Sequence, residues 1–251
     1  MKQQTITISG DQAVSIAILS RPHCLDIEGK HDLLKMVRSL SEQENLRVLI
    51  IAASDPEAWL VNVEELVEMS PDQARAFSRA GHQLADALAS LPAPVIAAVD
   101  GAALGGGCEL VLACDLAIAG ASAQFGQIEA MGGVIPAFGG TWRLARRVGN
   151  QRAMRMLLTA EVVDAETAKT IGLVLDTVPS AQLHDQARAL AAQIAKVSRQ
   201  SVAAIKRVVG VGTNLSPSSI SALEEEAFAG LFGTEDQRGR MRAFLANQGR
   251  R

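Results

Sequence analysis

The sequence predicts an α/β protein with a mainly parallel sheet and an all-helical C-terminal part. Short apolar runs typical of buried strands alternate with segments of helical periodicity up to about residue 180. Beyond that point every periodic segment is helical. The chain has 251 residues and 48% hydrophobic content. This is enough to bury a sizeable core in one domain with an appendage or in two small domains.

The N-terminal part is predicted to contain a hairpin, a helix, a strand and a long helix. The runs at residues 5–9 and 13–19 alternate or are apolar and flank a Ser-Gly-Asp turn, as expected of a β-hairpin. Apolar residues recur at helical spacing over residues 31–44, and a strand is predicted over residues 47–53. A longer helix is predicted over residues 72–91, where it ends before two prolines.

A buried strand at Val95–Val99 leads into Gly105, Gly106 and Gly107, and the helix that follows is apolar on every face. Consecutive glycines let a ligand approach bare peptide N–H groups at the positive end of a helix. Such a position stabilises negative charge, for example on a thioester oxygen that becomes enolate-like. On the glycines alone, a tight turn with close strand–helix packing is the more common explanation.

Two carboxylates stand in this apolar region. Glu109 is the one charge in the first turn of the predicted helix, and Glu129 is the one charge in the stretch FGQIEAMGG. A pair of carboxylates in a dry cleft can move protons on and off carbon or water, because burial raises one pKa towards the working pH. A single carboxylate at a helix start also simply complements the helix dipole, and the spacing of the pair does not show that they meet.

The remaining elements continue the alternation and then become helical. Strands are predicted over residues 115–119 and 173–178, separated by helices. Asp164 is predicted to cap the last of these helices. The helices before residue 180 are expected at residues 137–148, 151–159 and 164–171, and those after it at 183–197 and from about residues 201, 218 and 235.

The central motifs resemble the crotonase (enoyl-CoA hydratase/isomerase) superfamily, and especially its hydratase branch. They are AAVDGAALGGGCELVLACDLAIA, AQFGQIE and GVIPAFGGTWRLARRVG, and the similarity continues through MRMLLTAEVVDAETAKTIGLVLDTVP. The resemblance implies a ClpP/crotonase-like spiral of repeated ββα units over residues 1–196. It implies a helical oligomerisation region over residues 197–251, building homotrimers or hexamers that are dimers of trimers.

The resemblance also implies the chemistry. The expected reaction is the reversible syn addition of water to a trans-2-enoyl-CoA thioester, giving a 3-hydroxyacyl-CoA in fatty acid metabolism. The N–H groups of Val63 and Gly106 would form the oxyanion hole, Glu129 would protonate the α-carbon, and Glu109 would position and help deprotonate the water. Coenzyme A is then part of the substrate, and no cofactor or metal is expected. The implied substrate-binding residues are His23, Leu25, Val61, Glu64, Leu66, Gly105, Met131 and Phe138.

Two segments depart from the family pattern. His23 stands where relatives carry a lysine that helps to hold the nucleotide end of coenzyme A. The loop that supplies half of the oxyanion hole reads Trp59-Leu60-Val61-Asn62-Val63-Glu64 in place of Phe-Ser-Ala-Gly-Ala-Asp. A backbone donor tolerates most side chains, and Asn62 accepts positive φ better than most residues, so the turn can persist while the bulkier neighbours reshape the pocket.

Two alternative functions follow from these observations. An enoyl-CoA isomerase would use the same oxyanion hole, but isomerases of this superfamily commonly lack one of the two glutamates, so the presence of both favours a hydratase. A noncatalytic scaffold subunit of the same fold is the alternative from a different class, motivated by the altered loop and His23.

The composition argues against several partners and locations. A net charge of −3, an aromatic content of 3% and the lack of tyrosine argue against nucleic acid and anionic membranes. No apolar run approaches the ~20 residues that span a bilayer, and the N-terminal segment lacks the features of a secretory signal, so we expect a cytoplasmic protein. The three cysteines are expected to be buried thiols rather than disulfide or zinc ligands.

Overall fold

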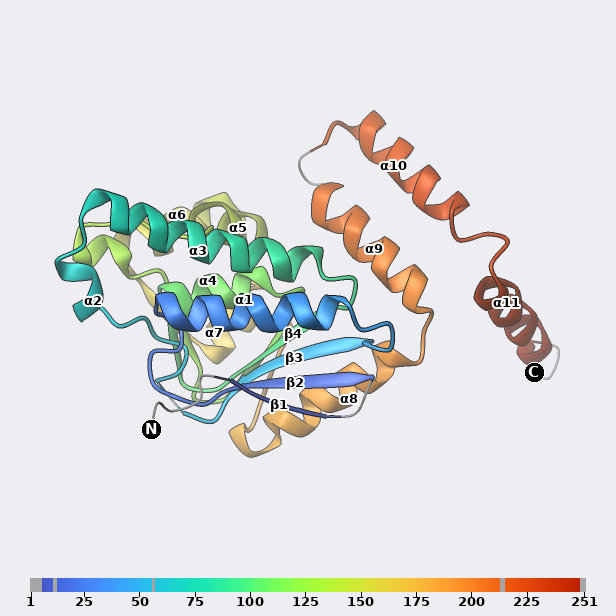
Figure 1. The fold of residues 1–251 in the computed structure, drawn as a ribbon, viewed down its shortest axis with the longest axis horizontal. Helices are drawn as coiled ribbons and strands as arrows, with labels where there is room; N and C mark the ends of the chain where they lie inside the picture. Colours follow the sequence, from blue (N-terminus) through green and yellow to red (C-terminus); the bar gives the residue numbers. More distant parts are fainter. Residues whose placement is uncertain (1–5, 11–12, 56, 213–214, 249–251) are drawn as a thin grey trace.

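A computed structural model of the chain describes residues 6–10, 13–55, 57–212 and 215–248. Its main feature is a six-stranded sheet with the order β1-β2-β3-β4-β6-β9 (Figure 1). The first two strands are antiparallel and all later neighbours are parallel, as the sequence predicts. The strands are β1 (Ile6–Gly10), β2 (Val14–Leu19), β3 (Val48–Ala53), β4 (Val95–Val99), β6 (Leu116–Gly120) and β9 (Asp176–Val178).

Helices cover both faces of this sheet, which explains why its central strands are apolar throughout. Helices α1 (Ile27–Ser41), α3 (Pro71–Ser90) and α4 (Gly106–Ala113) lie on one face, and α8 (Leu183–Ala195) lies on the other (Figure 1). Successive strand residues point to opposite faces, so Ile51 and Ala97 join the larger core whereas Ile50 and Ile96 pack towards α8.

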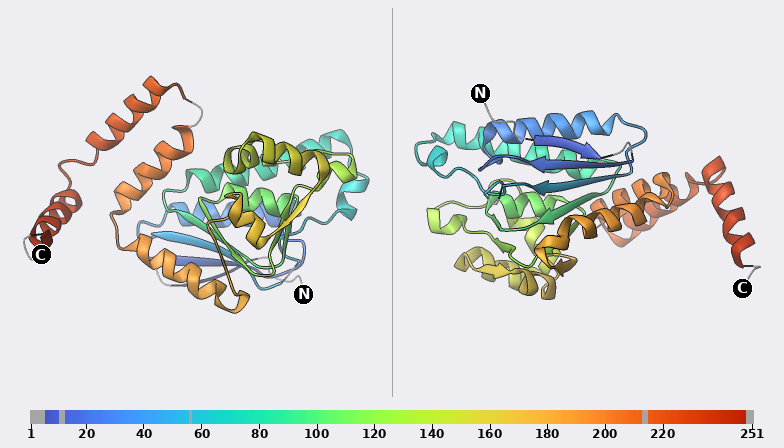
Figure 2. Two further views of the ribbon diagram at one scale, coloured as in Figure 1. Left: turned by 180° about the vertical axis from the view of Figure 1, so that it is seen from behind. Right: turned by 90° about the horizontal axis from the view of Figure 1, so that it is seen from below.

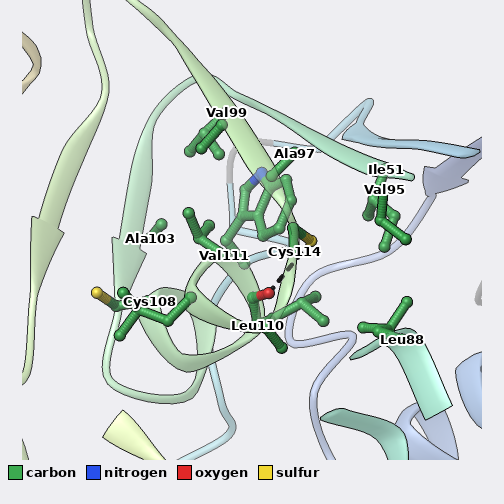
Figure 3. Packing of buried hydrophobic residues seen from close by; sticks show 14 of the residues in the cluster. Ile51, Leu88, Val95, Ala97, Val99, Ala103, Cys108, Leu110, Val111 and Cys114 are labelled. Atoms are coloured by element: carbon green, nitrogen blue, oxygen red, sulfur yellow. Dashed lines mark hydrogen bonds between the residues drawn. The ribbon is translucent and has the colours of Figure 1, made fainter. Parts of the chain in front are cut away.

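The larger core surrounds α4 and so fixes its position. Leu110 and Val111 of this helix pack among Val95, Ala97 and Val99 of β4 (Figure 3). Burial of such aliphatic side chains contributes about 1.5–3 kcal/mol each. The three cysteines of the chain are buried and reduced, as predicted.

A smaller sheet with the order β5-β7-β8 lies beside the first and is not predicted from the sequence. Its strands, β5 (Ala102–Leu104), β7 (Gln124–Gly126) and β8 (Val162–Asp164), have three residues each, too few to show a periodic pattern. The remaining elements of this part are the helices α2 (Glu64–Val67), α5 (Gly140–Val148), α6 (Asn150–Thr159) and α7 (Ala165–Thr170) and the 3₁₀ turns η1 (Glu129–Gly132) and η2 (Ser180–Gln182).

The last three helices extend away from this body: α9 (Arg199–Gly212), α10 (Pro217–Ala229) and α11 (Glu235–Gln248) (Figures 1 and 2). Lys206 ties α9 to the body, because its Nζ lies 2.7 Å from Asp115 Oδ2 and donates to the carbonyl oxygens of Leu88 and Ala93 at 2.9 and 3.1 Å. The boundary at residues 196 and 197 stays a prediction. In the described part of the chain, no helix combines the length and apolar character needed to cross a bilayer.

Several predicted boundaries are wrong for local reasons. Helix α1 begins at Ile27 rather than residue 31, because the Asp26 side chain accepts the Gly29 N–H and caps the helix earlier. Helix α5 begins at Gly140 rather than residue 137, and the last parallel strand is shortened to Asp176–Val178. Asp164 caps α7 as predicted, accepting the Thr167 N–H at 2.8 Å. Residues 5 and 11 of the predicted hairpin lie outside the described residues.

Candidate active site

The three glycines from the end of β5 into the first turn of α4 each have a different neighbour, which explains why side chains are absent there. Gly105 has φ +53°, and a Cβ on it would lie 3.1 Å from Glu129 Oε1. A Cβ on Gly106 would lie 2.6 Å from Val61 Cγ2, and one on Gly107 would overlap the carbonyl group of Trp59. The close-packing explanation of the glycines therefore holds, and the turn also brings a carboxylate to the start of α4. The approach of a ligand to the N–H groups stays a prediction.

The segment from Trp59 to Val61 lies directly on this glycine turn. Trp59 is fully buried in the larger core, and its backbone approaches Gly107. Val61 is half-buried, with its side chain against Gly106. Trp59 and Val61 of this loop thus pack against the glycines. This places the predicted oxyanion-hole loop beside the N-terminus of α4.

The two predicted donor amides have no internal acceptor. The N–H of Gly106 is the first of α4, and that of Val63 precedes α2. Neither amide has an acceptor among the described residues. Unpaired N–H groups at the start of a helix are available to an external anion or polarised carbonyl. Whether the two amides point to one oxygen stays a prediction.

Asn62 shapes the loop differently from the sequence expectation. It does not adopt positive φ, which in the described residues occurs outside glycine only at His23 and Ala160. Instead its Oδ1 accepts the Glu64 N–H at 3.1 Å and starts α2. The turn at Asn62 is thus stabilised by a side-chain hydrogen bond and needs no positive φ.

Glu109 is buried within α4 and holds the segment before α5. Its Oε1 accepts the N–H groups of Phe138 and Gly140 at 2.8 and 2.7 Å, and its Oε2 accepts that of Ala137 at 3.2 Å. Gly139, which lies between these donors, has φ +116°, and this left-handed conformation interrupts the helical run and explains the late start of α5. Burial raises the pKa of Glu109, while the three N–H groups and the charge of Lys30 oppose that rise.

Glu129 lies at the start of η1 with its carboxylate beside Gly105. Burial is the main cause that raises its pKa to about 7, and the negative charge of Glu109 adds to the rise. The amide of Gln127 lies close by, and in the orientation that satisfies its hydrogen bonds its nitrogen is 3.2 Å from both Glu129 oxygens. The two glutamates therefore both lie at the first turn of α4; burial raises the pKa of each, and the N–H donors of Glu109 oppose its rise.

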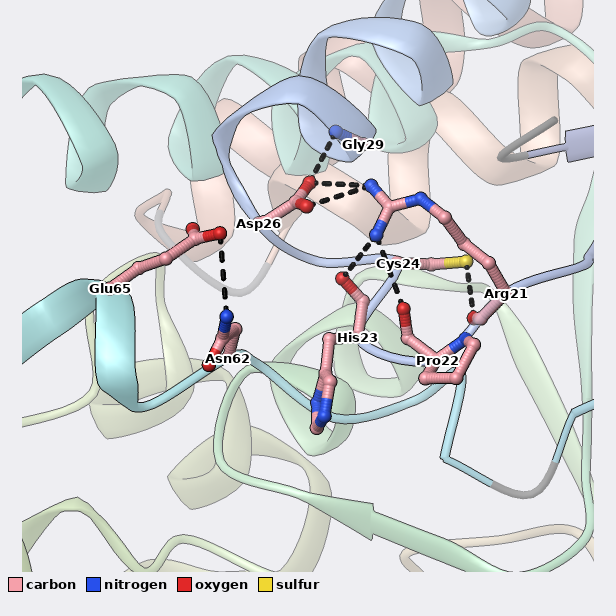
Figure 4. A network of polar contacts seen from close by, with 8 residues as sticks. All are labelled: Arg21, Pro22, His23, Cys24, Asp26, Gly29, Asn62 and Glu65. Atoms are coloured by element: carbon pink, nitrogen blue, oxygen red, sulfur yellow. Dashed lines mark hydrogen bonds and ion pairs between the residues drawn. The ribbon is translucent and has the colours of Figure 1, made fainter. Parts of the chain in front are cut away.

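The loop containing His23 is held rigidly beside the site. Arg21 Nη2 donates to both carboxylate oxygens of Asp26 at 2.8 Å, and its Nη1 donates to the carbonyl oxygens of Pro22 and His23 (Figure 4). His23 has φ +52°, and its N–H donates to Glu57 at 3.0 Å. The backbone of this loop is thus fixed, while a role of His23 towards substrate stays a prediction.

The other residues predicted to bind substrate differ in how far their side chains are exposed to solvent. Leu25 and Phe138 are fully buried, and Phe138 packs against Gly81 and Gly106. Leu66 is half-buried, and Glu64 is exposed. Met131 is 81% exposed in the same loop as the exposed Val134 and Ile135. The buried pair therefore shapes the site from behind, whereas this loop presents apolar side chains at the surface.

Three residues at the site are missed by the sequence reasoning. Gln127 lies within the quoted AQFGQIE motif, so its position two residues before Glu129 could have drawn attention. Lys30 and Arg143 carry no such signal, since charged residues on predicted helices are usually solvated. The described residues contain no cluster of three or more His, Cys, Asp or Glu side chains arranged to hold a metal.

Comparison with known proteins identifies the family. The family model for enoyl-CoA hydratase/isomerase matches residues 10–249. The chain belongs to this family. It is 33% identical over 250 residues to the short-chain-enoyl-CoA hydratase of Clostridium acetobutylicum, covering 98% of this chain and 96% of that protein. It is 32% identical, with the same coverage, to the crotonyl-CoA hydratase of Syntrophomonas wolfei.

The structure of this enoyl-CoA hydratase/isomerase family member agrees with the sequence match. It superposes on the crystal structure of the enoyl-CoA hydratase from Bacillus anthracis with a TM-score of 0.91 and 30% identity, covering 97% of each chain. The predicted family and crotonase-like fold are thus confirmed. The altered loop at Trp59–Glu64 is accommodated within that fold.

Proposed function

We propose that the protein is an enoyl-CoA hydratase that adds water reversibly to a trans-2-enoyl-CoA thioester. The observation that carries the proposal is the presence of Glu109 and Glu129 at the first turn of α4, beside two N–H groups that lack an acceptor among the described residues. The relatives named enoyl-CoA and crotonyl-CoA hydratases match nearly the whole chain. An acyl-CoA is therefore the substrate class.

The N–H groups of Gly106 and Val63 bind the thioester oxygen. Conjugation carries electron density from the alkene to that oxygen when a nucleophile attacks the β-carbon, so negative charge grows there in the transition state. The start of α4 contributes the positive end of its dipole to the same point. Donors of this kind contribute on the order of 100-fold or more to the rate each.

The two carboxyl groups divide the proton transfers. Glu109, whose carboxylate form is stabilised by its three N–H donors, accepts a hydrogen bond from water and takes its proton as the oxygen bonds to the β-carbon. Glu129, whose pKa is about 7, carries the proton that is given to the α-carbon. The product gains one hydroxyl and one hydrogen, and a proton passing from Glu109 to Glu129 restores the site.

Hydration of crotonyl-CoA tests the proposal. Loss of the conjugated double bond removes its ultraviolet absorbance, so the rate is read directly for the wild type and for Glu109→Gln and Glu129→Gln. We expect each variant to lose roughly 100-fold or more of kcat. The matched control is Glu44→Gln, because Glu44 is exposed beyond the far end of α1, about 20 Å along that helix from its start near the site. Unchanged turnover in both site variants would remove the assignment.

Two further measurements separate the alternative functions. A 3-enoyl-CoA offered to the wild type reports isomerase activity as a rise in absorbance, and a faster rise than the hydration of crotonyl-CoA would favour an isomerase. Calorimetry with an acyl-CoA tests the scaffold alternative. Failure to bind at millimolar concentration would end the enzymatic proposal.

We also propose that the chain forms a homo-oligomer through its last helices. Large apolar side chains remain exposed on α9, α10 and α11 and in the turn after α10, namely Ile205, Val209, Phe228, Phe232 and Phe244. A contiguous apolar surface of this kind is typical of a subunit interface. Light scattering should give three or six times the monomer mass of 26.5 kDa. A monomer at micromolar concentration would contradict this.

We propose a cytoplasmic location because the three cysteines are free thiols. Cys24, Cys108 and Cys114 are buried and reduced. Reduced cysteines are typical of proteins in reducing compartments. Fractionation of the producing cell tests the location, and recovery outside the cytoplasm would overturn it.

A further inference from the structure

Lys30 is a buried lysine that the proposed mechanism does not use. Its exposure is 0%, and its Nζ has no hydrogen-bond partner among the described residues. The Nζ lies 3.0 Å from the ring centroid of Phe77 and 4.8 Å from that of Phe138. Aromatic faces attract a cation but do not replace the hydrogen bonds of water, so an apolar side chain would fill this space at lower cost.

Among the acidic groups that act on Lys30, Glu109 is the main electrostatic partner. Glu109 acts on the amine most strongly, followed by Asp26 and Glu65. Asp26 already binds Arg21 through both carboxylate oxygens, and Glu65 is exposed. Glu109 is buried, so water screens its attraction for Lys30 least. Burial lowers the pKa of Lys30 to about 7, and Glu109 is the main group opposing this.

Phe138 joins the two groups structurally. Its ring faces the Lys30 amine, while its backbone N–H donates to Glu109 Oε1 at 2.8 Å. Arg143 approaches the same segment and donates to the Phe138 carbonyl oxygen at 2.7 Å, but its other nitrogen pairs with Asp86 at 3.3 Å. The charge of Arg143 is thus partly neutralised, whereas Glu109 is the buried acidic group that acts most strongly on Lys30.

We propose that Lys30 is a positioning residue whose ammonium group stabilises the carboxylate form of Glu109 and thereby favours the acid proton on Glu129. This inference rests on the proposed function for its catalytic meaning. Two carboxylates that share a site hold one proton between them at intermediate pH, because both do not ionise easily together. Lys30 adds a positive charge on the side of Glu109, where the three N–H donors already act.

Titration of Glu109 tests the electrostatic part directly. Side-chain carboxyl carbons are followed by ¹³C NMR from pH 4 to 10 in the wild type and in Lys30→Met, with Glu109→Gln identifying the signal. Methionine fills a similar volume without charge. We expect the midpoint of Glu109 to rise by about one to two pH units. The control is Lys35→Met, an exposed lysine on the same helix, which should leave the midpoint unchanged. An equal midpoint in Lys30→Met would overturn the proposal.

A reciprocal titration applies even if Lys30→Met does not fold. Coupling between two groups acts equally on both, so removing the charge of Glu109 must lower the pKa of the Lys30 amine. The amine is followed through ¹³Cε-labelled lysine in the wild type and in Glu109→Gln. A downward shift supports the coupling, and an unchanged or raised midpoint contradicts it.

The pH dependence of hydration tests the catalytic part. In Lys30→Met, kcat/KM for crotonyl-CoA should fall roughly tenfold to 100-fold at pH 6 and approach the wild-type value above pH 8, where the lysine is already neutral. Lys35→Met should keep the wild-type profile. A loss that is equal at every pH would indicate a packing role and overturn the proposal. If the wild type does not hydrate crotonyl-CoA, the proposed function fails, while the two titrations still decide the coupling.

Discussion

Replacing Glu129 with glutamine should make the protein more stable and nearly inactive, and the gain in stability should grow with pH. Folding raises the pKa of Glu129 from 4.5 to about 7. The protonated form of Glu129 is therefore favoured in the folded state. Its contribution to the free energy of unfolding is complete below pH 4.5 and is lost as the pH rises through 7. At roughly 1.4 kcal/mol per pH unit, this interval corresponds to about 3 kcal/mol at most. Because the side chain is partly exposed, we expect about 1–2 kcal/mol.

Urea unfolding at pH 5.5 and 8.5, at one fixed protein concentration, measures this difference. The free energy of unfolding of Glu129→Gln minus that of the wild type should be larger at pH 8.5, because glutamine stays neutral. The other titrating groups occur in both proteins, so their contributions to the pH dependence cancel in this difference. Glu44→Gln should show no pH-dependent difference. A gain that is equal at both pH values, or a loss at pH 8.5, would refute the assignment of Glu129 as the buried acid.

Three further predictions follow from the contacts of the site. Gly106→Ala should cost about 1–3 kcal/mol of unfolding free energy because its Cβ meets Val61, and Val61→Ala in the same chain should recover part of this; additive effects in urea unfolding would contradict the contact. Glu109→Gln should lower stability by about 1–3 kcal/mol besides abolishing hydration, since its amide nitrogen faces an N–H donor; unchanged unfolding would argue against the three hydrogen bonds. Asp26→Ala should cost about 1–3 kcal/mol, because α1 loses its cap and Arg21 its partner; a change below about 0.5 kcal/mol would contradict this.

The part of the fold that the sequence predicts is the part with long-range periodicity. Val95–Val99 is apolar at every position, and both faces of β4 are covered in the structure. The cap at Asp164 is predicted because aspartate before a helical run has a direct physical role. The strands of the small sheet have three residues each, and their pairing depends on neighbours distant in the chain. Local patterns carry no information about such pairing.

The part of the site that the sequence predicts is its list of acids, and the part that it misses is their environment. Glu109 and Glu129 stand out as single charges in apolar stretches. Lys30 does not, because a lysine on a helix of mixed polarity reads as solvated, and only the packing of Phe77 and Phe138 over it makes it buried. The segment before α5 reads as helix, since the acceptor for its N–H groups lies on α4.

The division of labour between the two glutamates follows from topology rather than from residue type. Both carboxyl groups are desolvated, and the charge of Glu109 further raises the pKa of Glu129. What differs is the supply of donors: α4 aims Glu109 at three N–H groups of a segment some thirty residues later, whereas Glu129 has the amide of Gln127. The donors stabilise the carboxylate form of Glu109, so the proposed mechanism assigns the proton to Glu129, which has fewer donors. It follows that a change in the segment before α5 would alter which glutamate is the acid, even with both glutamates intact.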